Sequence, residues 1–266
     1  MDDTIFGKIA EIEKSNQTAA LCTVIRSRGS TPRGAASKMI VYPNGEIMGT
    51  VGGGEMESRV ITEALEAIRQ NESKNVEYSM VEPERGDPGV CGGQVEVFIE
   101  PINPRPLLLI IGGGHVGRAV SRLGSWLGYR IAMSDDRLDY CNPEINPYAE
   151  EFYPVFLEEL PRQLEITPWT YVVLTTRGVD IDVPGLPGLL QSKAAYIGVI
   201  GSRRRWATTC AKLRENGIED RVLAKIHSPV GLDIHAETPE EIAVSIMAEI
   251  IMLRKGGSGK PMLAPS

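Results

Sequence analysis

The sequence has few cysteines and no long apolar run, and both absences limit what the chain can be. Its four cysteines are widely spaced, and no C-x-x-C pair occurs. We therefore expect reduced thiols and neither a zinc site nor a disulfide framework. No apolar run reaches the roughly 18 residues that a membrane-spanning helix requires. The sequence thus predicts no membrane partner.

Positive charge is also scarce. The net charge is −7 at pH 7, which argues against broad binding to nucleic acid or to anionic membranes, so we expect no nucleic-acid partner. An anionic ligand would need a local cluster of basic groups. The first residues, Met-Asp-Asp-Thr, lack the basic and apolar regions of a secretory signal, and we expect a cytoplasmic protein.

One apolar run that ends at glycines organises the second half of the chain. Leu107–Ile111 is followed by Gly112, Gly114 and Gly117 in the spacing G-x-G-x-x-G, and a helix is expected over 115–127. A continuous apolar strand is typical of a parallel sheet covered by helices on both faces. The first glycine permits a tight turn, the second lets a phosphate approach, and the third lets helix and strand pack closely. The pattern predicts a Rossmann-like domain.

The residues after this helix extend the fingerprint. Arg130–Ser134 is a second predicted strand, and Asp135 follows it at roughly the 20-residue distance where an acid binds a ribose. The helix N-terminus, which begins with His115, presents free N–H groups to an anion. Two interpretations stay open: a site for NAD(P) or another nucleotide, or a glycine turn that serves packing alone. A histidine in a glycine loop is often only a hydrogen-bonding group, and we expect no catalytic role for His115.

The first hundred residues predict a small α+β domain. Helices are expected over 5–14 and 55–69, and strands over 19–26, 38–42, 46–51, 76–80 and 95–100. A second glycine run, Gly52-Gly53-Gly54, stands between a strand and a helix, which suits anion binding. Glu55 and Glu57 in the first turn can instead satisfy the helix dipole. A ligand loop and a self-capped helix remain alternatives.

Cys91 differs from the other cysteines. It lies in Glu82–Gly93, a segment too rich in proline and glycine to pack like a core segment. An accessible cysteine is more often reactive than structural, so Cys91 is the predicted functional thiol. Cys22 and Cys210 are expected to be packed in a strand and on a helix, and Cys141 has no motif around it.

A proline-rich linker, residues 101–106, divides the predicted domains, 1–100 and 107–266. Beyond Arg130–Ser134, further strands are expected over 152–156, 171–175, 196–200 and 223–226. Residues 182–192 are expected to form only a short segment, because Pro184 and Pro187 interrupt it. Helices are predicted to end near Gly217 and to run over 239–255, the latter from a capping box at Thr238.

Three arginines follow Ser202 at the start of the penultimate predicted helix. Basic residues at a helix N-terminus oppose its dipole, at a cost of roughly 0.3–1 kcal/mol each if exposed. A bound anion would explain them, with Ser202 as the cap and guanidinium groups such as Arg203 on phosphate. Alternatively, the arginines reach carboxylates on a partner. We expect four segments to meet at the carboxyl ends of the parallel strands: 112–117, 175–177, 201–203 and 227–228.

Together these segments resemble the xanthine dehydrogenase accessory family, XdhC/CoxI. The resemblance covers about residues 21–255, and its motifs are Gly29-Ser-Thr-Pro-Arg33, Lys38-Met39, Gly49-Thr-Val-Gly-Gly-Gly54 with Glu57, Cys91-Gly-Gly93, Gly112-Gly-Gly-His-Val-Gly117, Asp135-Asp-Arg137, Gly201-Ser-Arg-Arg-Arg205, Gly231-Leu-Asp-Ile234 and Glu237-Thr-Pro-Glu-Glu-Ile-Ala243. Two positions depart from the pattern. Ala36-Ser37 replaces a glycine-containing pair, and His235 replaces a glycine.

The resemblance implies an α/β, largely non-catalytic maturation factor. It would bind molybdenum cofactor (molybdopterin), shelter it during sulfuration and deliver it to a xanthine dehydrogenase-like molybdoenzyme, with a cysteine desulfurase as a further partner. A homo-oligomer is also expected. The residues expected to bind cofactor are Arg33, Gly52, Gly53, Gly54, Cys91, Gly92, Gly112, Gly114, His115, Gly117, Asp135, Ser202 and Arg203, with Cys91 as the metal ligand. The alternatives are an NAD(P)-dependent oxidoreductase, although no Tyr-x-x-x-Lys is present, and a non-catalytic nucleotide-binding protein.

Overall fold

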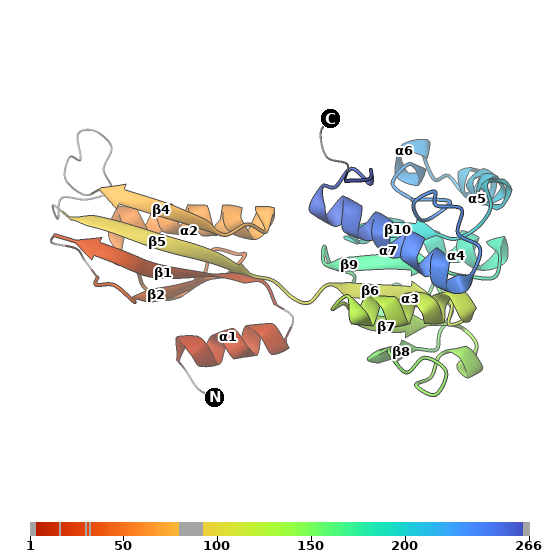
Figure 1. Cartoon of the computed structure of the whole chain (residues 1–266), viewed down its shortest axis with the longest axis horizontal. Coiled ribbons are helices and arrows are strands. Elements are labelled where there is room, and N and C mark those ends of the chain that lie inside the picture. Colours follow the sequence, from red (N-terminus) through yellow and green to blue (C-terminus); the bar gives the residue numbers. More distant parts are fainter. Residues whose placement is uncertain (1–3, 16, 30, 32, 80–92, 263–266) are drawn as a thin grey trace. The chain divides into compact units, whose positions relative to one another are not determined.

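The structure is a computed structural model that describes residues 4–15, 17–29, 31, 33–79 and 93–262. The chain forms two compact units, Met1–Pro104 and Arg105–Ser266, and each is described by itself. Both units combine helices with one five-stranded sheet (Figure 1). This arrangement confirms the predicted α/β class.

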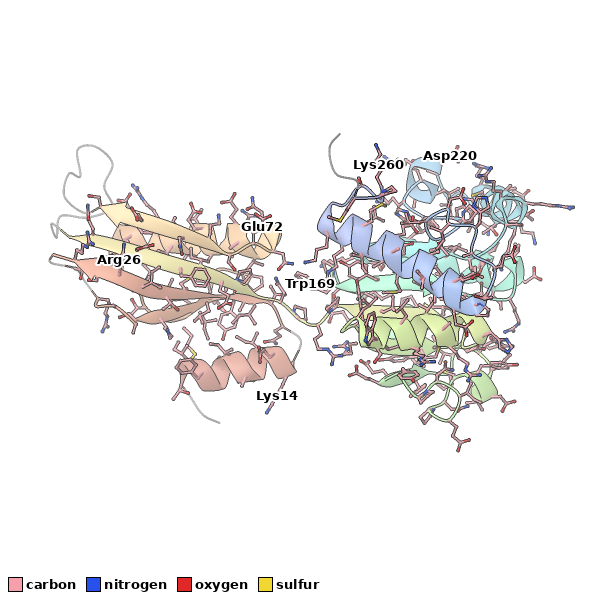
Figure 2. The ribbon with its side chains drawn as sticks, in the orientation of Figure 1. Lys14, Arg26, Glu72, Trp169, Asp220 and Lys260 are labelled. Atoms are coloured by element: carbon pink, nitrogen blue, oxygen red, sulfur yellow. The ribbon has the colours of Figure 1, made fainter. Side chains whose placement is uncertain are left out.

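The first unit is an antiparallel sheet with a helix on each face. The strands lie in the order β3-β2-β1-β5-β4. Their bounds are Ala19–Arg28 for β1, Lys38–Val41 for β2, Ile47–Gly49 for β3, Lys74–Ser79 for β4 and Gln94–Ile102 for β5. Side chains alternate across β1, so that Cys22 and Val24 pack with α2 (Gly54–Gln70) and Ala19 packs with α1 (Ile5–Lys14) on the other face (Figures 1 and 2). The alternation gives each helix its own apolar surface.

Strand β5 extends further than the sequence suggested. Pro101 and Ile102, which begin the predicted linker, belong to β5 and pair with Ala20 and Ala19 of β1. β1 provides a pairing edge there, so strand pairing overrides the local preference of proline for a linker. Cys22 is fully buried, as expected, and burial raises the pKa of its thiol to about 12.

The second unit is a parallel sheet in the order β10-β9-β6-β7-β8. Its strands are β6 (Leu107–Ile111), β7 (Arg130–Ser134), β8 (Glu151–Tyr153), β9 (Thr170–Leu174) and β10 (Tyr196–Val199). Every residue of β6 and β9 is buried, because apolar side chains cover both faces of the sheet. Helices α3 (His115–Trp126) and α7 (Pro239–Lys255) pack with one face, and α4 (Val179–Leu190) and α5 (Arg203–Glu215) pack with the other. This confirms the predicted Rossmann-like domain.

The prediction was wrong for one segment that contains two prolines. Residues 179–190 form the continuous helix α4, although Pro184 and Pro187 lie inside it. Leu186 and Leu189 of this helix are fully buried in the core. A side chain at Gly185 would come within 2.1 Å of Leu157, so α4 packs closely on that residue. Tertiary packing thus outweighs the cost of proline in a helix interior.

The expected strand at 223–226 is also absent. Asp220–Leu223 is a short helix, α6, and Ile226 N donates to Leu223 O at 3.0 Å in the turn that follows. Leu223 and Ile226 are both buried and lie three residues apart. This is a helical spacing, whereas a strand would place them on opposite faces. Two short 3₁₀ turns, Leu138–Tyr140 and Leu160–Arg162, lie in the connections that follow β7 and β8.

Candidate functional site

The strand order of the second unit reverses beside β6, which is the place where open α/β sheets bind ligands. A cavity of about 340 Å³ lies at these carboxyl ends. It is lined by Ile111, Gly112, Ser134, Asp135, Asp136, Arg137, Val155, Phe156, Leu157, Glu158, Thr176, Arg177, Asp180, Ile181 and Pro184. We call this cavity the crevice. It brings Gly112, Asp135 and the segment 176–177 together, as the sequence predicted.

The glycines of the fingerprint have different physical roles. Gly112 has φ 112°, a conformation that side chains disfavour. A Cβ on Gly117 would lie 1.9 Å from Gly112 O, so this glycine is required for the close contact of α3 with the turn after β6. A Cβ on Gly114, by contrast, would meet no heavy atom within 4 Å. Space therefore stays open beside Gly114, at the start of α3.

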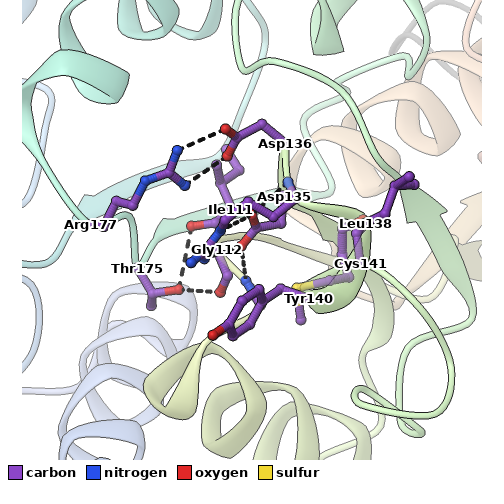
Figure 3. A network of polar contacts seen from close by, with 12 residues as sticks. Ile111, Gly112, Asp135, Asp136, Leu138, Tyr140, Cys141, Thr175 and Arg177 are labelled. Atoms are coloured by element: carbon purple, nitrogen blue, oxygen red, sulfur yellow. Dashed lines mark hydrogen bonds and ion pairs between the residues drawn. The ribbon is translucent and has the colours of Figure 1, made fainter.

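Asp135 is held by its own chain. Its side chain is 2% exposed and pairs with Arg137 Nη2 at 2.9 Å. It also accepts hydrogen bonds from Arg137 N, Arg137 Nε and Gly113 N (Figure 3). Both carboxylate oxygens are therefore engaged, and a ribose would have to replace Arg137 to reach them. The ribose-binding role of Asp135 stays a prediction, and the observed role of this residue is to fix the glycine turn to the end of β7.

The next carboxylate joins two strand ends across the crevice. Asp136, after β7, accepts two hydrogen bonds of 2.8 Å from Arg177, which follows β9 (Figure 3). This bidentate pair with the Arg177 guanidinium holds the pKa of Asp136 below its ordinary value. Thr175, close to Arg177 in the chain, donates to Gly112 O at 2.7 Å. These contacts tie β9 to the glycine turn.

Helix α3 has an N-terminus that its own chain leaves unsatisfied. Its N-cap, Gly114, offers no side-chain acceptor, and its first turn holds no acidic residue. The other helices of ten or more residues in the described chain differ: Thr4, Ser202 and Thr238 cap α1, α5 and α7, and acidic residues stand in the first turns of α2 and α4. The first N–H groups of α3 are therefore available to an anion.

Ser134 adds a hydroxyl to the crevice that the sequence did not single out. Its Oγ is buried and has no hydrogen-bond partner among the described residues, and Ser134 lines the crevice beside Gly112. A buried hydroxyl without a partner is costly, which favours a ligand or water here. The pattern of the apolar strand predicted the position of Ser134, but not that its hydroxyl would be free.

The predicted cluster at 201–205 lies only partly at the crevice. Ser202 accepts from Arg205 N at 3.2 Å, which confirms Ser202 as the cap. Arg205 pairs with buried Asp182 at 2.6 Å and bonds Thr176. A carboxylate of this same chain thus accounts for one of the three arginines. Arg203 and Gly201 line a different cavity, formed with residues 229–236.

His227 and Ser228 also lie away from the crevice. His227 Nδ1 is 3.1 Å from Glu249 Oε1, and its ring stacks on Tyr196 at 4.7 Å. Tyr196 donates to Glu249 at 2.6 Å, and Gly231 N donates to the same carboxylate at 2.7 Å. Burial raises the pKa of Tyr196. Sequence analysis missed Glu249, since nothing distinguishes an acid inside an otherwise apolar helix, and the cluster ties α7 to the edge of β10.

The glycine run of the first unit is closed by an acid. Glu57 Oε2 accepts from Val51 N at 3.2 Å and Gly53 N at 3.3 Å, and it also bonds Thr50. These are the loop N–H groups that an anionic ligand would use. The structure therefore favours the self-capped alternative for Gly52–Gly54.

Several predicted residues lie elsewhere. Arg33 is exposed, and Cys91 and Gly92 lie outside the described residues. Cys141 and Cys210 are buried. Within the described ranges, no group of three or more His, Cys, Asp or Glu residues could hold a metal ion, and no helix is long and apolar enough to cross a membrane.

Family models match both halves of the chain. The XdhC Rossmann domain model matches residues 108–250, and the XdhC and CoxI family model matches residues 13–79. The chain belongs to the XdhC/CoxI family. A solved structure named as a xanthine dehydrogenase from Bacillus halodurans covers 100% of this chain and 98% of its own, with TM-score 0.52 and 22% identity. That similarity shows a shared fold.

Three curated relatives are similar to this chain. It is 36% identical over 269 residues to the uncharacterized protein YqeB of Escherichia coli, covering 98% of this chain and 48% of YqeB. It is 33% identical over 159 residues to a probable xanthine dehydrogenase component of Bacillus subtilis, covering 60% and 46%. It is 23% identical to the molybdenum cofactor insertion chaperone PaoD of Escherichia coli, covering 99% and 92%. The chain thus spans about half of the first two relatives.

Proposed function

We propose that this protein is a maturation factor that binds molybdenum cofactor and assists its sulfuration and insertion into a xanthine dehydrogenase-like molybdoenzyme. Family membership and the similarity to PaoD, which covers 99% of this chain, support the proposal. In this role the client molybdoenzyme is the main partner, and a cysteine desulfurase provides the sulfur.

The composition of the crevice is the observation that carries the proposal. Hydride transfer to or from a nicotinamide requires an acid–base group beside the reacting oxygen. Among the described residues that line the crevice, none is His, Tyr, Lys or Cys. Asp135 and Asp136 are both paired with arginines. The crevice is therefore suited to binding and holding an anionic group rather than to dehydrogenase chemistry.

The residues of the second unit fit the phosphate end of a pterin cofactor. The uncapped N-terminus of α3 and the unpartnered Ser134 hydroxyl offer donors, and the open space at Gly114 lets a phosphate approach the backbone. The cofactor would supply the metal centre of the client enzyme, and the residues of this chain would bind and orient it. The proposed soft metal ligand is Cys91.

Direct analysis of bound cofactor tests the proposal. The full chain is purified from a molybdate-fed host, and its molybdenum and pterin contents are measured beside those of Gly114→Val and of a matched control, Gly178→Val. Gly178 is the N-cap of α4, where a Cβ would also meet no heavy atom, but acidic residues occupy the first turn of that helix. We expect pterin in the wild type and in the control, and a strong loss in Gly114→Val. Turnover of NAD(P) by a protein that carries no pterin would instead establish the oxidoreductase alternative.

A further inference from the structure

A groove runs along α3, separate from the crevice. Two cavities, of about 420 and 570 Å³, share Ala119, Arg122, Tyr148 and Glu240 in their walls and therefore form one groove. The walls come from α3, α7 and residues 145–148, all within the second unit. No residue of the groove lines the crevice.

One end of the groove is cationic. His115, Arg118 and Arg122 occupy one face of α3, because they are spaced three and four residues apart. None of the three forms an ion pair with any described residue. Glu240 is the carboxylate that this end of the groove presents, so with His115 neutral the two arginines leave net positive charge on a protein of net charge −7. Two unpaired guanidinium groups suit a phosphate.

Two buried polar atoms at the same end lack partners. Ser121 and Asn146 are 0% and 1% exposed and line the groove. Ser121 Oγ and Asn146 Oδ1 have no hydrogen-bond partner among the described residues. The Asn146 amide group donates to Tyr140 O at 2.7 Å, which leaves Oδ1 as a free acceptor. Unpartnered buried atoms of this kind point to a bound molecule that supplies both an acceptor and a donor.

The other end of the groove is aromatic and apolar. Trp126, one helical turn after Arg122, is 81% exposed, and Tyr148 and Val244 are 44% and 50% exposed. Such large apolar side chains next to arginines are typical of a binding surface. Trp126 and Tyr148 offer ring faces on which a flat ring system can stack.

We propose that this groove binds a small phosphate ester that carries a flat ring system, the class that includes nucleotides and pterin phosphates. The phosphate lies on Arg118 and Arg122, and the ring lies against Trp126 and Tyr148. Hydroxyl or amino groups of the ligand donate to Asn146 Oδ1 and to Glu240. The length of α3 between Arg118 and Trp126, about 12 Å at 1.5 Å per residue, matches the span of a nucleotide. The inference does not depend on the proposed function.

Binding to the full chain is measured by calorimetry and by tryptophan fluorescence. The probes are AMP, neopterin monophosphate, adenosine and ribose 5-phosphate. We expect one or both ring-bearing phosphates to bind and to change the Trp126 signal, and the matched fragments without phosphate or without ring to bind about tenfold more weakly or worse. The stronger of AMP and neopterin monophosphate identifies the source of the ligand. Failure of both to bind would overturn the proposal.

Variants locate the binding in the groove. Arg118→Gln combined with Arg122→Gln should weaken AMP or neopterin monophosphate binding by roughly 10- to 100-fold and remove the preference over the phosphate-free probe. Trp126→Phe should remove the fluorescence change but keep most of the affinity. Arg204→Gln, at another exposed arginine of the same unit, is the control and should bind like the wild type. Unchanged affinity in the double variant would place the ligand elsewhere and refute the inference.

Discussion

The two glycine loops of this chain follow the same strand–glycine–helix pattern but carry opposite charges at the same helical position. The fourth residue of α2 is Glu57, and the fourth residue of α3 is Arg118. Glu57 turns back and accepts hydrogen bonds from Val51 N and Gly53 N. In the second loop, Asp135 comes from the next strand and takes only Gly113 N among the loop amides.

This difference decides which loop can receive an anion. In the first loop, a ligand would have to displace Glu57 and restore three hydrogen bonds. In the second, the first turn of α3 has no acid, and the space at Gly114 is open. A glycine turn before a helix therefore predicts an anion site only when the first turn of that helix lacks an acid placed to reach the loop.

The largest expected effect compares glycines of the two loops. Gly117→Ala should lower the free energy of unfolding by about 3 kcal/mol, because its Cβ would lie 1.9 Å from a backbone oxygen that cannot move freely. Gly54→Ala meets no neighbouring atom and suffers only from its φ of 66°, which costs about 1–2 kcal/mol. Urea denaturation of both variants measures this. Equal losses would mean that close packing does not distinguish the second loop.

The acids of the two loops should differ next. Asp135→Asn should cost about 3 kcal/mol, since it places an amide donor against Arg137 and Gly113 N and removes a buried partner charge. Glu57→Gln should cost about 1 kcal/mol or less, because the contacts to Glu57 use a single oxygen that the amide carbonyl can replace. Thermal or urea unfolding of the pair checks the order. A larger loss in Glu57→Gln would contradict the assigned roles.

Local patterns predicted the frame of the molecule better than its polar contacts. The apolar runs of β6 and β9 and the capping box at Thr238 could be read directly, because burial and capping follow from neighbouring residues. The helix through Pro184 could not, because distant core residues stabilise it. The pairing of Asp135 with Arg137 and of His227 with Glu249 also depended on the tertiary fold. Sequence spacing alone placed Asp135 near the glycines without showing that its oxygens are occupied.

A smaller effect tests whether the first unit binds cofactor although its glycine loop is closed. Any ligand role of that unit then rests on Cys91. Cys91→Ser should leave stability unchanged but lower pterin retention or client activation. Cys22→Ser is the matched control: it places a hydroxyl in an apolar core where Cys22 is 0% exposed, and should cost about 1–3 kcal/mol. Melting temperature and bound pterin are measured for both. Full pterin occupancy and normal client activation in Cys91→Ser would remove Cys91 from the proposed site.

The smallest effect concerns the carboxylates that follow the glycine loops. Asp136→Asn should lower stability at pH 7 by only about 0.2–1 kcal/mol, because Arg177 is half exposed and solvent screens the pair. Arg177 lowers the pKa of Asp136 in the folded state, so this stabilisation is complete above the unfolded value of about 3.9 and is lost as the pH falls through the lower, folded value. The difference between the variant and the wild type should therefore shrink below about pH 4. Urea titrations between neutral and acidic pH measure it, with Glu55→Gln, in the exposed pair with Arg59, as the control for the first loop. A difference that stays constant down to the most acidic pH would show that the Asp136 charge does not cause the stabilisation.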